Sequence, residues 1–192
     1  MTVESHPLEP FLPADAKVLF LGSFPPPKAR WSMDFFYPNW INDFWRIMGL
    51  IYYGDKSCFE CLGDKRFDRK KVVDFCLEHG FAFYDSAVKV CRLKDNASDN
   101  YLQILEATDI VSLLRRIPDC RAIVTTGGKS SEEVASILGT GSVPAIGESL
   151  NVILDGREVC WYRVPSSSRA FPMKIEKKAY YYKLVLGSIG LL

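Results

Sequence analysis

Three consecutive prolines at residues 25–27 follow a short apolar run at residues 18–21. The run combines β-branched and aromatic residues, which predicts a buried strand, and Gly22 predicts a sharp exit from the sheet. Proline has no backbone N–H and a fixed φ, so the next segment can continue neither a sheet nor a helix interior. We therefore expect a stiff loop at the carboxyl end of this strand, where open α/β sheets bind their ligands.

The remainder of the chain alternates strand and helix patterns. The sequence predicts a helix at 43–48, with Asn42 as its N-cap and Gly49 as its end, a helix at 69–79 and a strand at 81–84. Helical patterns begin at Tyr101 and at Asp109, and a strand at 122–125 and a helix at 130–138 follow. The last predicted elements are a hairpin of 150–154 and 159–164 around Asp155-Gly156 and a helix from about Met173. Such alternation favours a parallel sheet covered on both faces. The predicted fold class is α/β, a three-layer α/β/α sandwich with a central, mainly parallel sheet.

Length and composition limit the class of protein. With 192 residues, 48% of them hydrophobic, the chain can bury one sizeable core, and we expect a single domain over residues 1–192. The net charge of +1 gives no overall signal for nucleic acid. We see no signal peptide, membrane-spanning run or lipidation motif, so we expect a soluble, cytoplasmic and monomeric protein that does not bind membranes.

Three familiar site patterns are absent or incomplete. Cys58 and Cys61 form a C-x-x-C without a second pair, so we expect no metal and no cofactor. A P-loop reading of residues 125–132 fails because Ile123 stands where the pattern needs a glycine. The histidines lie in the N-terminal arm (His6) and in the last turn of a helix (His79), neither of which suits a nucleophilic triad.

Three motifs resemble the uracil-DNA glycosylase superfamily, most closely its mismatch-specific uracil/thymine and hypoxanthine-DNA glycosylase branches. The first is GSFP, FFYPN and NDFW at residues 22–45, where the family has a G-x-x-P turn, an aromatic-x-His-Pro element and N-x-F-W; Tyr37 replaces the His, and residues 39–41 lengthen the gap. The others are residues 81–99 and the VPSSSRA segment at 164–170. The resemblance implies a DNA glycosylase that excises uracil or hypoxanthine in base excision repair.

The resemblance also implies roles for individual residues. Asn42 would orient the attacking water, with Asp43 and Asp34 as fallback carboxylates, and the bond would break through an oxocarbenium-like state. Phe35 would stack on the flipped base, the backbone at Gly22, Ser23 and Phe24 would contact it, and Asp85 would accept from a ring N–H. Each has a structural alternative: a helix cap for Asn42, core packing for Phe35 and a turn cap for Asp85.

DNA affinity is expected from the C-terminal fifth of the chain, because residues 163–183 contain six basic residues and one acidic residue, Glu176. The basic residues are Arg163, Arg169, Lys174, Lys177, Lys178 and Lys183. The candidate DNA-binding residues are Ser166, Ser167, Ser168, Arg169, Phe171, Lys174, Lys177 and Lys178. Such a run is also typical of a solvated helix face. Two other functions stay open: a nucleic-acid-binding protein that keeps the fold without catalysis, and an enzyme acting on free nucleosides.

Overall fold

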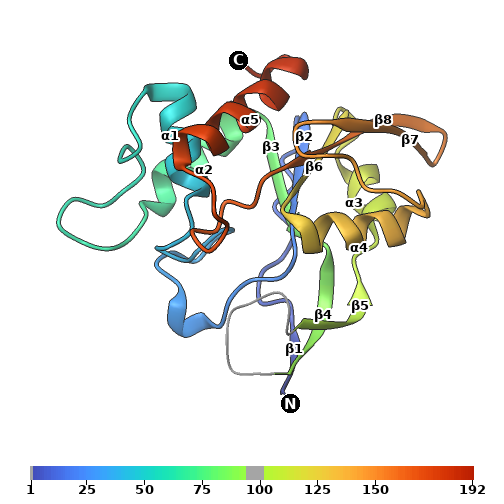
Figure 1. Cartoon of the computed structure of the whole chain (residues 1–192), viewed down its shortest axis with the longest axis horizontal. Helices are drawn as coiled ribbons and strands as arrows, with labels where there is room; N and C mark the ends of the chain where they lie inside the picture. Colours follow the sequence, from blue (N-terminus) through green and yellow to red (C-terminus); the bar gives the residue numbers. More distant parts are fainter. Residues whose placement is uncertain (1, 94–101) are drawn as a thin grey trace.

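The computed structural model describes residues 2–93 and 102–192, which form a mixed α/β fold around a central sheet (Figure 1). The order of this five-stranded sheet is β3-β2-β6-β8-β7. Its strands are β2 (Val18–Gly22), β3 (Phe81–Asp85), β6 (Ala122–Thr126), β7 (Ser149–Leu154) and β8 (Arg157–Val164). Neighbours from β3 to β8 pair in parallel, and only β7 is antiparallel to its partner. The predicted central, mainly parallel sheet is therefore confirmed.

The strands at the centre of the sheet are buried along their length. All five residues of β2 and all five of β3 are buried, as continuous apolar runs in a two-sided parallel sheet should be. The hairpin predicted at Asp155-Gly156 joins β7 to β8, and Asp155 adopts a positive φ of 53° in its turn. These elements form where the local sequence pattern places them.

Five α-helices lie within the described residues: α1 (Phe44–Tyr53), α2 (Arg69–Glu78), α3 (Ile110–Arg116), α4 (Gly128–Leu138) and α5 (Ile175–Ser188). In Figure 1, α1, α2 and α5 gather on one side of the central sheet and α3 and α4 on the other. None of these helices has both the length and the apolar character needed to cross a membrane. The structure is thus a mixed α/β fold around a central sheet, with a second sheet that the predicted three-layer sandwich does not include.

This second sheet was not predicted. It has the order β1-β4-β5 and contains β1 (Thr2–Ser5), β4 (Ala87–Arg92) and β5 (Leu102–Ala107). The helical pattern expected from Tyr101 is wrong: Tyr101 itself lies outside the described residues, and Leu102–Ala107 pairs antiparallel with β4. Leu102 and Ile104 alternate at the strand period and pack on a small cluster of their own. The N-terminal arm is likewise a strand at its start.

The predicted end of the first helix is also wrong. Helix α1 continues through Gly49 to Tyr53 and ends at Gly54, which has a left-handed φ of 67°. Gly49 instead provides room for the following loop, because a Cβ there would lie only 2.4 Å from the backbone oxygen of Asp55. A short 3-10 helix, η1 (Lys28–Arg30), follows the prolines.

Candidate active-site pocket

A pocket of about 620 Å³ opens where the parallel strands of the central sheet end. Gly22 ends β2, Asp85 ends β3, Thr126 ends β6, and Ser166 follows β8; all four line the pocket. The proline loop closes part of its wall. Of the predicted site residues, Gly22, Ser23, Phe24, Asn42, Asp85, Ser166, Ser167, Ser168 and Phe171 line it, whereas Asp43, Phe35, Arg169, Lys174, Lys177 and Lys178 do not.

Two motif segments far apart in the sequence are joined at the pocket wall. Asn42 and Ser168 form an antiparallel bridge, and the Asp43 N–H donates to the carbonyl oxygen of Ser167 at 2.9 Å. Residues 165–169 after β8, called the serine loop, are held by α5, because Lys178 Nζ donates to the Ser168 carbonyl at 2.7 Å and Tyr182 Oη donates to the Pro165 carbonyl at 3.1 Å. The segment before α1 and the segment after β8 therefore form one polar edge of the pocket.

Asn42 reaches the pocket with its amide oriented by the backbone. Its Oδ1 accepts from the Phe44 N–H at 2.9 Å, which fixes Oδ1 toward the first turn of α1. The N-cap position belongs to Asp43, whose side chain makes no capping hydrogen bond. Asn42 thus supports the helix start, as the structural alternative expects, and it also lines the pocket.

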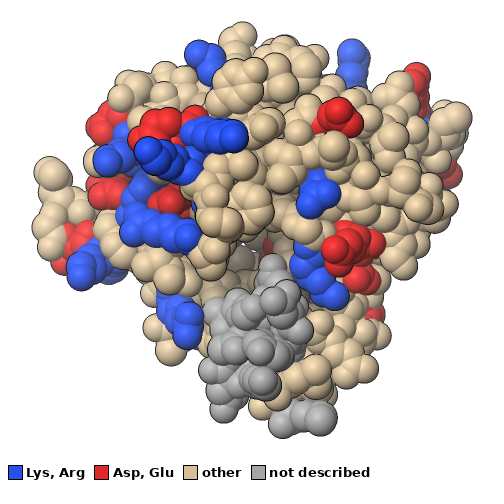
Figure 2. All heavy atoms as spheres, viewed as in Figure 1, with Lys and Arg blue, Asp and Glu red and all other residues tan. Residues whose placement is uncertain are grey.

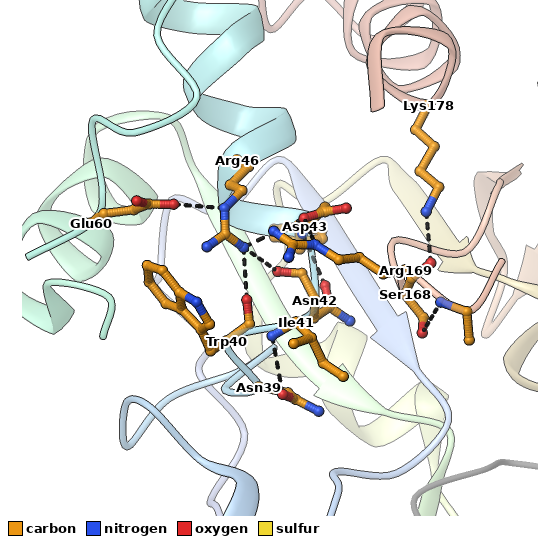
Figure 3. A network of polar contacts seen from close by, with 12 residues as sticks. Asn39, Trp40, Ile41, Asn42, Asp43, Arg46, Glu60, Ser168, Arg169 and Lys178 are labelled. Atoms are coloured by element: carbon orange, nitrogen blue, oxygen red, sulfur yellow. Dashed lines mark hydrogen bonds and ion pairs between the residues drawn. The ribbon is translucent and has the colours of Figure 1, made fainter. Parts of the chain in front are cut away.

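Asp43 is committed to ion pairs, so its assignment as a fallback catalytic carboxylate is not supported. Its Oδ1 accepts from Arg169 Nε at 2.8 Å and lies 3.4 Å from a nitrogen of Arg46, and its side chain is 10% exposed (Figure 3). Because two guanidinium groups flank this carboxylate behind the pocket wall, it is placed to fix the loop rather than to meet a water.

Arg46 is the centre of the network in Figure 3. Its guanidinium donates to Glu60 at 2.6 Å, to the Trp40 carbonyl at 2.8 Å and to the Asn42 carbonyl at 3.2 Å. The rings of Trp40 and Phe67 flank it at 4.3 and 5.0 Å from their centroids. Arg46 therefore connects Glu60, in the segment after α1, to residues 40–42, and this connection gives residues 54–68 a structural role.

Asp85 occupies the strand-end position expected of a base-reading side chain. Its Oδ2 lies 2.9 Å from His6 Nε2. Its Oδ1 lies against Gly22, where an added Cβ would be 2.4 Å away. Gly22 is therefore needed for the close approach of this carboxylate to β2.

The aromatic lining differs from the prediction. Phe35 packs in the core between Phe11 and Trp45 and does not line the pocket; Phe36 and Phe24 line it instead. Phe35 is therefore not placed for the stacking role that the resemblance implies for it, whereas Phe24 and Phe36 have rings at the pocket.

Tyr37, which replaces the family's histidine, is locked into the pocket wall. It has a positive φ of 51°, stacks on Phe44 with ring centroids 4.0 Å apart, and shares a 2.9 Å hydrogen bond with Thr126. Burial raises the pKa of its hydroxyl well above the usual value. The phenol is therefore neutral and serves as a hydrogen-bonding group at the end of β6.

The predicted DNA-binding residues divide into two groups. Lys178 is buried against Ser168, and desolvation lowers its pKa, so its assignment as a phosphate contact is wrong. Lys174 and Lys177 are exposed. Figure 2 shows a face hollowed near its middle, with Lys and Arg side chains on both sides interspersed with Asp and Glu. The basic side chains on this face therefore form local groups among acidic ones.

Several residues at the site carry no local signal in the sequence. His6 lies 79 positions before Asp85 and meets it only in the fold. Arg30 and Thr126 line the pocket from a short 3-10 helix and from a strand end. The sequence could have indicated Thr126 as a site residue, because it directly follows the predicted strand at 122–125, whereas it gives no such signal for His6 or Arg30.

Within residues 2–93 and 102–192, no group of three or more His, Cys, Asp or Glu side chains could hold a metal ion. Burial raises the pKa of the Cys58 thiol to about 11, which disfavours the thiolate that zinc needs.

Comparison with known proteins identifies a solved structure of similar fold. No family model and no curated protein matches the chain. A solved structure from Methanosarcina acetivorans, provisionally assigned as a uracil DNA glycosylase, is similar with a TM-score of 0.60 and 21% sequence identity, covering 96% of this chain and 99% of that one. At this identity the likeness concerns the fold. The chain therefore has a fold like that of the M. acetivorans protein over nearly its whole length.

Proposed function

We propose that the protein is a monofunctional DNA glycosylase that hydrolyses the N-glycosidic bond of a deaminated or mismatched base, with uracil or hypoxanthine preferred. The observation that carries this proposal is the meeting of Asn42, Asp85 and the serine loop around one pocket at the carboxyl ends of the parallel strands. The similar fold of the M. acetivorans protein supports it. The preference for uracil or hypoxanthine follows from the resemblance of the sequence motifs to the mismatch-specific and hypoxanthine branches of the uracil-DNA glycosylase superfamily.

Asn42 is the residue proposed to position the attacking water. A carbonyl oxygen has two lone pairs, and the Phe44 N–H takes only one, leaving the other for a water. Departure of the base through an oxocarbenium-like state needs a held water rather than a strong base. The Phe44 N–H prevents the amide from flipping, so the oxygen keeps a constant direction.

The rest of the pocket suits a base that has left the duplex. Its volume of about 620 Å³ falls in the range of small-molecule sites. Phe24 and Phe36 offer rings for stacking, which is worth about 1–3 kcal/mol per base, and Asp85 offers an acceptor for a ring N–H. Backbone N–H groups at Ser23 and Phe24 are proposed to meet charge that develops on the base.

DNA contacts are proposed from the loop after β8 and the start of α5. Ser166 and Ser168 line the pocket and carry hydroxyls suited to phosphates, and Arg169 keeps half its side chain exposed while bound to Asp43. Phe171 lines the pocket, where it could fill the space that the base leaves. Exposed Lys174 and Lys177 complete this surface.

The test is single-turnover cleavage of labelled oligonucleotides that carry uracil, hypoxanthine, xanthine or mismatched thymine, followed by alkaline strand scission. Asn42→Ala should lower the rate on the preferred base by about 10²-fold or more while DNA affinity stays nearly constant. Asn42→Asp keeps an acceptor for the Phe44 N–H and should keep helix stability. Asn151→Ala, which removes an exposed amide bonded to Glu158, is the matched control.

One observation favours the second candidate, a nucleic-acid-binding protein without catalysis. The Asn42 side chain already serves the start of α1. If Asn42→Ala loses about 1 kcal/mol of stability and DNA affinity falls in parallel, Asn42 is a cap. No cleavage across the substrate panel, with DNA still bound, would favour this binding function over the glycosylase.

A further inference from the structure

The N-terminal strand places His6 next to Asp85, which lines the pocket. His6 directly follows β1, which pairs with β4 of the second sheet. The His6 backbone N–H donates to the Val88 carbonyl at 2.7 Å, and its Nε2 lies 2.9 Å from Asp85 Oδ2. The His6 side chain is 1% exposed, so this contact is shielded from solvent.

The imidazole has little freedom to turn. Tyr84 lies 4.6 Å away between ring centroids, Phe24 meets the ring edge-on at 5.4 Å, and Phe36 stacks at 6.2 Å. At the other nitrogen, Nδ1 lies 2.8 Å from the Leu8 carbonyl and 3.2 Å from the Leu8 N–H. Packing and both nitrogens therefore fix the ring.

The two oxygens of Asp85 have different surroundings. Oδ2 faces His6, whereas Oδ1 lies against Gly22 at the pocket. Among the residues that the structure describes, Oδ1 has no hydrogen-bond partner, and the Asp85 side chain is 11% exposed. Oδ1 is consequently the oxygen left for a ligand.

The contact with His6 orients the carboxyl group of Asp85. His6 Nε2 holds Oδ2 at 2.9 Å, while Oδ1 lies against Gly22 at the pocket. A carboxylate oxygen accepts hydrogen bonds, so Oδ1 presents an acceptor in a fixed direction.

We propose that His6 is a positioning residue for base selection: by holding Oδ2 it fixes the direction of Asp85 Oδ1, an acceptor, so that the pocket takes bases with a ring N–H and rejects cytosine and adenine. This inference rests on the proposed function and names its substrate class. Cytosine and adenine present a ring nitrogen that is itself an acceptor, which leaves two acceptors facing each other. Without His6, the carboxyl group is free to rotate, and Oδ1 no longer keeps a fixed direction toward the base.

The test measures binding rather than cleavage. Duplexes carry deoxyuridine or deoxycytidine with a 2′-fluorine, which suppresses departure of the base, and the ratio of their dissociation constants is determined. Wild type should prefer uracil. His6→Ala should reduce the preference by about tenfold, the size of one hydrogen bond, and His6→Gln, whose amide can donate to Oδ2, should restore part of it.

His79→Ala, a change in the chain's other histidine, is the control and should leave the ratio unchanged. The ¹⁵N resonances of the His6 ring provide a second readout on the folded wild type, and they should move on binding the uracil duplex and not the cytosine duplex. An unchanged ratio in folded His6→Ala overturns the inference, and so do His6 resonances that shift with neither duplex. If the wild-type protein cleaves no substrate, that result contradicts the proposed glycosylase activity and not the role of His6, because the binding ratio is measured without cleavage.

Discussion

Gly22→Ala is the most direct perturbation of the base-reading end of the pocket. The added Cβ would lie 2.4 Å from Asp85 Oδ1 and 3.5 Å from its Cγ. Ordinary contact begins near 3.4 Å, so Oδ1 has to withdraw by about 1 Å. That movement cannot preserve the 2.9 Å contact between Oδ2 and His6, whose ring is held by packing.

The expected cost follows from these contacts. Overpacking costs about 1–3 kcal/mol, and part of it is offset because alanine loses less backbone entropy than glycine. We therefore expect Gly22→Ala to lower the free energy of unfolding by about 2 kcal/mol. In a chain of this length, that corresponds to a fall in Tm of about 4–8 °C. Urea and thermal unfolding measure both quantities.

A double-mutant cycle tests whether the cost acts through Asp85. In an Asp85→Ala background the clashing carboxylate is gone, so Gly22→Ala should cost less than about 0.5 kcal/mol. Gly187→Ala is the control, because its Cβ would meet only Leu192 at 3.8 Å and should be neutral or stabilising within α5. An equal cost of Gly22→Ala in both backgrounds would refute the reasoning and place the strain elsewhere.

Two further predictions concern the DNA surface and the pocket wall. If Lys177 meets a phosphate, Lys177→Ala should reduce the slope of log affinity against log salt by about one unit; Lys178→Met should leave that slope unchanged and, by leaving the Ser168 carbonyl without its donor, destabilise the fold by about 1–3 kcal/mol. Equal slope changes from both lysines would contradict the burial of Lys178. The raised pKa of Tyr37 means that the folded state holds this proton more tightly, so its contribution to stability is complete below pH 10 and is lost as pH rises above it. Tyr37→Phe should flatten the alkaline decline of stability, and an unchanged profile would assign that decline to other groups.

Much of this site could be predicted because local pattern and parallel pairing act together. The strand at Val18–Gly22 and the strand before Asp85 are continuous apolar runs, and parallel strands bring their carboxyl ends to one edge. Gly22, Asp85 and Ser166 therefore meet where the sequence predicts. The helical pattern predicted from Tyr101 failed because Leu102 and Ile104 also fit a strand, and only pairing with β4 decides between the two.

The sequence by itself determined that the central sheet is mainly parallel and at which edge polar residues collect, since both follow from hydrophobic period and turn chemistry. Tertiary structure alone decided which neighbours face the pocket: Phe36 rather than Phe35, and an inward Lys178 beside an outward Lys177. It also brought His6 to Asp85 across 79 positions. The physical reason is that such contacts depend on how separate elements pack, and the energy of packing is not contained in either segment alone.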